Sequence, residues 1–330
     1  MTSQSGDRAD SARADSCAYF VNNRPQVSWA WDLKDRNLNF LRAIDPGYYV
    51  HIRKHEAPIL EEAGLDAQYA AASIRLAHAQ AVETLFALLG ALAQAPYCPI
   101  GWMLAYSNPE LREVTKALIS IQGLVDKSAW EEGVTLGKLA NLVFSRTGWL
   151  EEKVASTAES FARMWQHWAS SMLDMHQVAE YNSFKHGSRV ALGGHAIRIG
   201  RETTPGLAVP SEGMVTMGGS VFGTSFYTSV ELGGRLHQYP QQRSHNWSAT
   251  ALVDGLDLLA MSIRNVIACL RIIGGDDPGE CEFQIPEDPA AYNLPFAPVR
   301  GVTLSSFDLK LGVENIEPLT KDQVLHRLRP

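Results

Sequence analysis

The chain has 330 residues and a mass of 36.3 kDa, which is enough for one large domain or two with a sizeable buried core. Its 45% apolar and 20% charged residues are ordinary for a soluble globular protein. The formal net charge of −7 excludes a global basic field that would hold a polyanion, so a local basic patch is the remaining route to one.

The N-terminus and the cysteines both bear on the compartment. Residues 1–16 are small and of mixed charge, contain no apolar run typical of a signal peptide, and predict a disordered tail. The four cysteines form no C-x-x-C pair, and Cys98 and Cys269 lie in apolar runs. They predict reduced, mostly buried thiols in a cytoplasmic protein.

The first strong helix signal follows an aromatic, irregular stretch over residues 17–60. A segment rich in Ala and Leu predicts a helix from about Asp66 to Ala95. The uncharged run from Thr84 to Pro109 is long enough to cross a membrane. Because two prolines, at positions 96 and 99, interrupt this run, we expect a buried helix end and a tight connection, and no membrane span.

Two shorter helices are predicted next. Asn108 is a good N-cap and Pro109 suits the first helical position, after which apolar residues recur at helical spacing up to Ile121. A further short helix is predicted from Leu136 to Phe144.

Two long apolar stripes predict helices that pack as a bundle. The first lies on a helix expected from Leu150 to His186, and its members step by three or four: Phe161, Trp165, Trp168, Met172, Met175 and Ala179. The second runs from Leu252 to Ile273 and is closed by Gly274. Stripes with this spacing pack against each other in helical bundles.

The sequence between the two stripes is typical of β-strands. Its apolar residues alternate on either side of the pair Gly193-Gly194, which predicts a hairpin there. We therefore predict a mainly α fold, a helical bundle over residues 17–274 as a single domain, with a β-hairpin or meander insertion at about 188–240. Residues 275–330 are predicted to form an extended arm packed on this domain, with one strand candidate at 301–311.

The heptapeptide YNSFKHG, residues 181–187, ends the first stripe. The basic residues before Gly187 suit the negative end of a helix dipole, and the glycine supplies a left-handed cap. In a regular helix, His186 projects about 20° and Asn182 about 60° from the direction of Phe161, on the core side. A buried polar pair needs partners, so a pocket or an interface is predicted around Asn182 and His186.

This spacing resembles the signature of the HEPN superfamily of helical-bundle proteins, many of them RNases of toxin and phage-defence systems. In that motif an Arg is followed by a polar residue and then, near a helix end, by a His. Asn182 and His186 match the last two, whereas Tyr181 stands at the Arg position. The resemblance implies that His186 acts as general acid or base on a ribose 2′-OH and that Asn182 positions the phosphate. Tyr181 offers only a neutral hydroxyl, so the cation that holds the phosphate is missing.

Other residues are candidates for the missing cation. Arg75 and His78 share one face of the Ala-rich helix, and Lys185 within the heptapeptide could serve if the helix end unwound to redirect it, so these three are the candidate binding residues. Alternatively, Arg75 covers apolar surface with its stem. Arg243 and His245, just before the last long helix, are comparable candidates.

A divalent metal site is a further alternative. His176 and Glu180 are four residues apart on the same expected helix, and with His186 they would offer nitrogen and oxygen ligands. A solvated pair on the helix flank also explains them, because neither E-x-x-H nor H-E-x-x-H occurs in the sequence. We predict no metal and no other cofactor.

Two classes of function stay open at this point. The missing Arg and the acidic net charge favour a non-catalytic binding or assembly module of HEPN-like fold, in which Asn182 and His186 form a structural hydrogen bond. The alternative is an RNA-cleaving enzyme of the HEPN type that uses His186. The aromatic stripes and the irregular arms at both ends predict a homodimer. RNA is the candidate nucleic-acid partner, and DNA is not expected.

Overall fold

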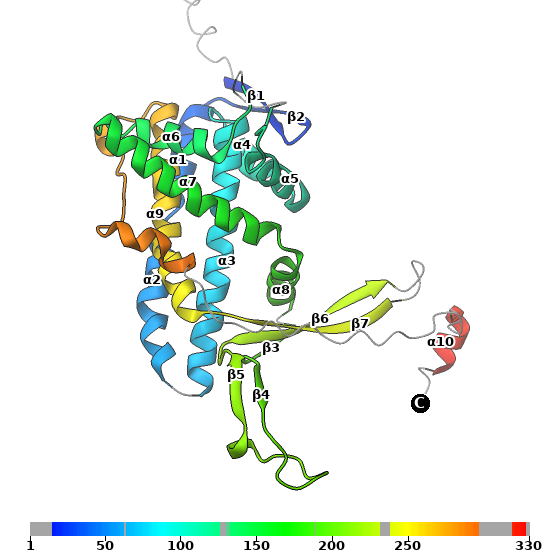
Figure 1. Cartoon of the computed structure of the whole chain (residues 1–330). Coiled ribbons are helices and arrows are strands. Elements are labelled where there is room, and N and C mark those ends of the chain that lie inside the picture. Colours follow the sequence, from blue (N-terminus) through cyan, green and yellow to red (C-terminus); the bar gives the residue numbers. More distant parts are fainter. Residues whose placement is uncertain are drawn as a thin grey trace, which may run out of the picture. The chain divides into compact units, whose positions relative to one another are not determined.

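The computed structural model describes residues 15–62, 64–125, 130, 132–187, 189–231, 238–296 and 319–327 (Figure 1). Within these ranges the chain is mainly helical with short antiparallel strands, which confirms the mainly α prediction. The chain divides into two compact units, Met1–Val178 with Ala249–Pro298, and Ala179–Ser248 with Val299–Pro330. The strand candidate at 301–311 and all but the last two residues of the predicted disordered tail lie outside the described residues.

A hairpin opens the first unit. Strands β1 (Asp15–Val21) and β2 (Arg24–Ala30) pair antiparallel around a turn in which Asn22 has φ 52°. Asn tolerates this left-handed conformation better than most residues. The Gln94 side-chain amide fixes the turn, since it accepts the Asn22 N–H at 2.9 Å and donates to the Asn22 carbonyl at 3.0 Å. The description of residues 17–60 as irregular was therefore wrong.

Helices make up the rest of the first unit. In chain order they are α1 (Leu33–Ala43), α2 (Gly47–Glu56), the 3-10 turn η1 (Ala57–Glu61), α3 (Leu65–Gln94), α4 (Pro99–Ala105), α5 (Asn108–Leu118), α6 (Leu136–Ser145), α7 (Glu151–Leu173) and α9 (Ala249–Gly274), followed by the 3-10 turns η3 (Pro278–Glu280) and η4 (Pro289–Phe296). The helices predicted at 66–95, 136–144 and 252–273 are confirmed as α3, α6 and α9. The N-cap of α5 is Ser107, one residue earlier than predicted, and it forms a capping box with Glu110.

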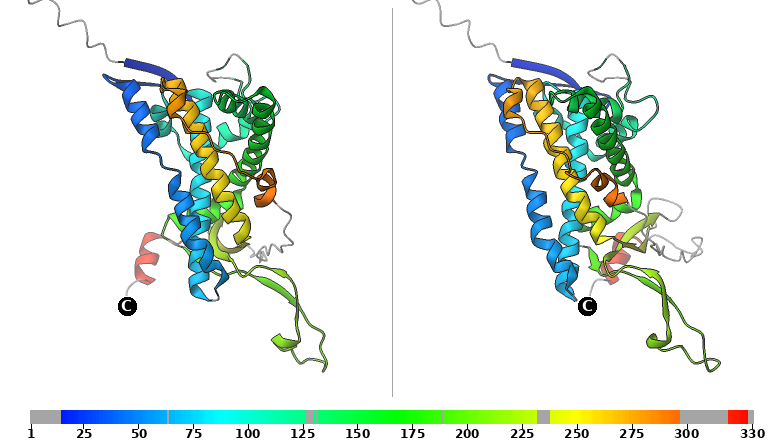
Figure 2. Two further views of the ribbon diagram at one scale, coloured as in Figure 1. Left: turned by 90° about the vertical axis from the view of Figure 1, so that its left-hand side faces the viewer. Right: turned by 60° about the vertical axis from the view of Figure 1, so that its left-hand side comes forward.

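Helix α3 is the central element of the first unit. Its last ten residues, 85–94, are all buried, and α9 runs beside it (Figure 2). An apolar window of α3 is long enough to cross a membrane, but 72% of that window is buried inside the fold. A core helix of a soluble protein has the same length and composition. Pro99 then begins α4, so the tight connection predicted after α3 is confirmed.

The two apolar stripes meet in this core. Trp165 of α7 is fully buried, and its indole N–H donates to the Ser262 hydroxyl of α9 at 3.1 Å. The start of the predicted C-terminal arm packs against α7, where Phe296 stacks on His167 and Tyr292 meets Phe161 edge to face.

All four cysteines are free, and Cys98, Cys269 and Cys281 are buried, as predicted. Burial raises the pKa of the Cys269 thiol to about 12. This thiol therefore stays protonated and packs as a small apolar side chain.

The single helix predicted from Leu150 to His186 is two helices. Helix α7 ends at Leu173, and Asp174 adopts an extended conformation with φ −70° and ψ 113°. The Asp174 carboxylate then accepts the backbone N–H of His176 at 2.9 Å and so caps the start of α8 (Met175–Lys185). The side-chain directions predicted from Phe161 at 100° per residue are therefore wrong beyond residue 174.

The second unit contains the other described strands, β3 to β7, and these extend past the predicted limit of 240. The described elements of this unit are the end of α8, then β3 (Val190–Leu192), β4 (Ala196–Ile199), the 3-10 turn η2 (Ser211–Gly213), β5 (Val215–Gly219), β6 (Gly223–Glu231), β7 (Gln238–Asn246) and α10 (Lys321–Arg327). Strands β3, β6 and β7 form one antiparallel sheet, and β4 and β5 form a separate pair.

The hairpin predicted around Gly193-Gly194 was wrong, because β3 pairs with β6 and β4 pairs with β5. Gly193 has φ 126°, and Gly194 lies so close to residue 220 that a Cβ would come within 1.9 Å of the Ser220 carbonyl oxygen. The two glycines lead the chain from one sheet to the other. Alternation alone cannot separate a local pairing from a non-local one.

Candidate functional site

The heptapeptide YNSFKHG ends helix α8. The helix stops at Lys185 and Gly187 has φ 98°, which confirms the predicted cap. Asn182 is half-buried, but His186 is exposed, so the expectation that both side chains face the core was wrong for His186. The physical reason is the break at Asp174, which changes the direction of every side chain that follows.

Tyr181 and Lys185 interact with each other on this helix. The Lys185 ammonium lies 5.6 Å from the centroid of the Tyr181 ring, a cation–π arrangement across one helical turn. The catalytic roles predicted for Tyr181, Asn182 and His186 stay predictions.

Arg75 and His78 lie in the first unit, whereas the heptapeptide lies in the second. Both side chains are buried on α3, and the Arg75 guanidinium donates to the Gln177 side chain at 3.4 Å. Within the described part of the chain, the His78 Nδ1 atom has no hydrogen-bond partner. Burial, and secondarily the charge of Arg75, lowers the pKa of His78 to about 3. His78 is therefore a neutral core group at physiological pH.

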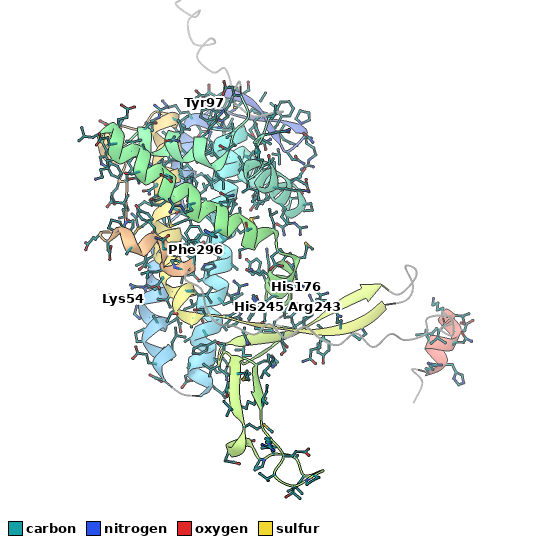
Figure 3. All side chains as sticks on the ribbon, viewed as in Figure 1. Lys54, Tyr97, His176, Arg243, His245 and Phe296 are labelled. Carbon is teal, nitrogen blue, oxygen red and sulfur yellow. The ribbon has the colours of Figure 1, made fainter. Side chains whose placement is uncertain are left out.

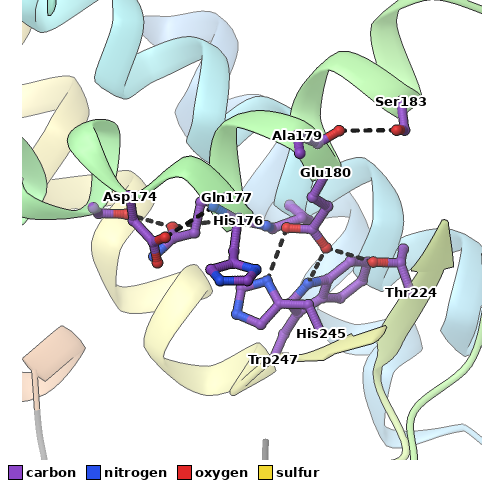
Figure 4. Close-up of polar contacts among 11 residues, drawn as sticks. Asp174, His176, Gln177, Ala179, Glu180, Ser183, Thr224, His245 and Trp247 are labelled. Carbon is purple, nitrogen blue, oxygen red and sulfur yellow. Dashed lines mark hydrogen bonds and ion pairs between the residues drawn. The ribbon is translucent and has the colours of Figure 1, made fainter. Parts of the chain in front are cut away.

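The most highly organised polar cluster in the second unit centres on Glu180 (Figure 4). Glu180 has no exposed surface. Its Oε1 accepts the Thr224 hydroxyl at 2.5 Å and the Trp247 indole N–H at 2.8 Å, and its Oε2 lies 3.0 Å from His245 Nδ1. These contacts tie α8 to β6, to β7 and to the segment that follows β7. We call this set of four residues the Glu180 cluster.

The strand register places Arg243 beside this cluster. Thr224 of β6 stands opposite His245 of β7, and Phe226 stands opposite Arg243. Residues directly opposite, and residues two apart along a strand, share one face of a sheet. Arg243 and His245 therefore lie on the face that carries Thr224, and both are labelled on β7 in Figure 3.

The carboxylate sets which ring nitrogen of His245 carries the proton. A carboxylate oxygen is an acceptor, so the His245 Nδ1 atom donates to Glu180 and the neutral ring keeps a lone pair on Nε2. His245 is 28% exposed, so solvent or a ligand can reach the ring. A histidine whose Nδ1–H is held by a buried carboxylate is oriented to move a proton at Nε2.

A second histidine lies on the opposite face of the same strand pair. His195 Nε2 is 2.8 Å from the Ser225 hydroxyl, which is 2.9 Å from the Ser244 hydroxyl. The Asn246 side chain holds the His195 backbone by accepting its N–H at 2.9 Å and donating to its carbonyl at 2.8 Å. One strand pair thus carries an organised histidine on each face.

The described residues contain no group of three or more His, Cys, Asp or Glu side chains that could hold a metal ion. His176 is exposed and belongs to the first unit, whereas Glu180 is buried in the second. The solvated flank pair that the sequence suggested for Glu180 was therefore wrong, because this carboxylate is fully enclosed by hydrogen-bond donors.

The Glu180 cluster was missed because Glu180 lies 44 to 67 residues along the chain from the three residues that contact it. One local signal was available: His245 and Trp247 are two apart at the end of a strand, so their side chains share a face. Each brings an N–H donor, and two donors on one buried face require an acceptor.

No family model matches this chain, and comparisons with curated proteins and with solved structures found no match either.

Proposed function

We propose that the second unit binds single-stranded RNA and that His245, oriented by Glu180, is its proton-transfer residue. The observation that carries this proposal is the 3.0 Å contact between His245 Nδ1 and the buried Glu180 carboxylate. The heptapeptide then serves to end α8, and the histidine role that the HEPN resemblance implies for His186 passes to His245.

The local charge supports an anionic ligand. Residues 179–248 contain six Lys and Arg residues against four Glu residues, a formal charge of +2 within a chain of −7. One of the four acids, Glu180, is buried and held by donors, so it adds little negative potential at the surface. A cationic region of this kind draws in phosphate groups at low ionic strength.

Arg243 supplies the cation that the heptapeptide lacks. It lies two residues from His245 on the same face of β7, and a guanidinium can hold two oxygens of one phosphate. In the proposed reaction, His245 Nε2 takes the proton of a ribose 2′-OH. The 2′ oxygen then bonds to the adjacent phosphorus, the bond to the 5′ oxygen breaks, and water protonates that leaving oxygen. The products are a 2′,3′-cyclic phosphate and a 5′-hydroxyl end.

An RNA assay tests this proposal. Fluorescence anisotropy with a labelled single-stranded RNA should show binding that weakens with salt, and more so in Arg243→Gln than in the matched control Arg198→Gln. Cleavage in EDTA, followed on gels that resolve cyclic phosphate ends, should fall by roughly 10²- to 10⁴-fold in His245→Ala and in Glu180→Gln. In Glu180→Gln the new amide donates to Nδ1, so the proton moves to Nε2 and the base is lost.

The His186→Ala variant distinguishes proton transfer by His245 from proton transfer by His186. This variant should keep full activity. Loss of cleavage in His186→Ala with retention in His245→Ala would return the role to the heptapeptide. RNA binding without any cleavage would leave only a binding function, and absence of binding at low salt would reject the RNA proposal.

A second candidate is an assembly module, which the exposed face of β2 favours. Val27 and Trp29 alternate with inward-facing residues on β2, Trp31 follows, and Trp29 is 68% exposed. Clustered exposed apolar side chains of this kind mark interaction surfaces. Among the described strands β2 pairs only with β1, so its outer edge is open to a second copy of the chain. In this candidate the first unit is a helical-bundle scaffold and the cytoplasmic protein is a homodimer.

Light scattering coupled to size exclusion tests the assembly candidate. The wild-type chain should elute at about twice its mass of 36.3 kDa. Trp29→Ser should shift it to the monomer mass, whereas Tyr97→Ser, which removes an equally exposed aromatic ring elsewhere in the first unit, should not. A wild-type monomer at micromolar concentration would contradict this candidate.

A further inference from the structure

A pocket in the first unit lies apart from the Glu180 cluster. It has a volume of about 290 Å³ and is formed by the end of α1, the residues between α1 and α2, one face of α9, the end of η3 and the segment after it. The side chains at its floor, Leu41, Ile267 and Ala268, are buried and apolar. This volume is at the small end for ligand sites, so the ligand is a small molecule with an apolar part.

The wall of the pocket is fixed before any ligand arrives. The Asn265 side chain of α9 donates to the Gln284 carbonyl at 2.7 Å and accepts the Gln284 N–H at 2.7 Å. The side-chain amide thus pairs with the Gln284 backbone as a neighbouring β-strand would, and it holds the extended segment against α9. A preformed wall lowers the entropic cost of binding.

Two of the three arginines at the pocket are already neutralised. Arg42 donates to one oxygen of Asp276 at 2.6 Å, and Arg271 donates to the other at 2.7 Å. The Asp276 side chain is almost fully buried, so both ion pairs are well defined. These two arginines therefore have a structural role and are not available to a ligand.

Arg264 is different, because its Nε donor is not satisfied. This atom is buried and has no hydrogen-bond partner among the residues that the structure describes. Its Nη1 atom reaches the exposed Glu282 carboxylate only at 3.5 Å, which is long for a charge-assisted hydrogen bond. A buried guanidinium N–H without an acceptor is costly, and an oxyanion in the pocket would supply that acceptor.

Carboxylates also line the pocket. Glu280, Glu282 and Asp45 are exposed, and Glu282 lies beside Arg264 and accepts the Gln284 side-chain N–H at 2.9 Å. A ligand with negative charge alone would be repelled by these carboxylates, whereas a ligand with both charges matches the arginine and the carboxylates. From these features we propose that the pocket binds a free aliphatic α-amino acid. The carboxylate lies on Arg264, the ammonium faces Glu280 and Glu282, and the side chain lies on the apolar floor.

Isothermal titration calorimetry of the full chain with L-leucine tests this proposal. We expect saturable binding with a Kd on the order of 0.1–1 mM, as suits a ligand of this size. Arg264→Gln should weaken binding by about tenfold to a hundredfold, because it removes a charge-assisted contact. The matched control Arg163→Gln changes an exposed arginine of α7 outside the pocket and should bind like wild type.

Two analogues of leucine identify the ligand class. 4-Methylpentanoate lacks the ammonium and 3-methylbutylamine lacks the carboxylate, and each should bind at least tenfold more weakly than leucine. Glu282→Gln, a change at an exposed side chain that should leave folding intact, should narrow the difference between leucine and 4-methylpentanoate. No heat of binding with leucine at 10 mM would overturn the proposal. It would also be overturned by unchanged affinity in a folded Arg264→Gln variant, or by equal affinity for the acid.

Discussion

Replacement of Glu180 by leucine should destabilise the second unit by about 3–5 kcal/mol. The change leaves the Thr224 hydroxyl, the Trp247 indole N–H and the His245 ring without their acceptor. Each buried donor that loses its partner costs about 1–3 kcal/mol, and neighbouring losses are not fully additive. Hydrogen exchange measured by mass spectrometry on peptides from residues 190–246 reports this effect separately from the first unit.

Two further variants separate the hydrogen bonds from the change in size. Glu180→Gln keeps an oxygen for Thr224 and Trp247 and should cost only about 1 kcal/mol, although it abolishes the proposed proton transfer. Glu212→Leu, at an exposed position of η2, makes the same change of residue type and should have little effect. If Glu180→Leu exchanged as slowly as wild type, the Glu180 cluster would not be an organising element of the second unit.

Acidification should destabilise the first unit through His78. The pKa of this imidazole falls from 6.5 to about 3 on folding, so between these values the unfolded chain binds a proton that the folded chain does not. Stability is therefore lost as pH falls through this window. The loss should reach about 2–3 kcal/mol between pH 6.5 and 4.5. Urea unfolding, followed by tryptophan fluorescence at several pH values, measures it.

The comparison of variants isolates the contribution of His78 from that of other titrating groups. His78→Leu fills a similar volume with an apolar side chain. In this variant the free energy of unfolding should no longer lose the part that His78 contributes as the pH falls. His55→Leu, at an exposed histidine of α2, should leave the dependence as in wild type. If the free energy of unfolding changed with pH in the same way in wild type and in His78→Leu, the assignment of a neutral, buried imidazole would be contradicted.

The long helices could be predicted because their signals are local. In α9 the apolar residues repeat every three or four positions, and in α3 the apolar character extends around the whole helix, so both elements follow from the sequence alone. The break at Asp174 was missed since the apolar spacing continues through Met172 and Met175. A single carboxylate that caps the next helix outweighed that pattern.

The candidate site could be predicted only in fragments. The sequence motif at the exposed end of α8 pointed to His186, whereas Glu180, six residues earlier, has the sequence context of an ordinary surface carboxylate. Its burial depends on Thr224 and Trp247, which reach it through the pairing of β6 and β7. Strand pairing of this kind is non-local, and the alternation around Gly193-Gly194 indicated a different partner.

By itself, the sequence determined the mainly helical class, the extent of α3, α6 and α9, the free cysteines and the glycine that ends α8. The reason is that helix periodicity, capping and chain composition act over a few residues. Only the tertiary structure decided that Glu180 is buried, that His245 is oriented by it and that Arg264 keeps an unmatched donor. These properties depend on which distant segments exclude water from one another, and that is settled by packing of the whole unit.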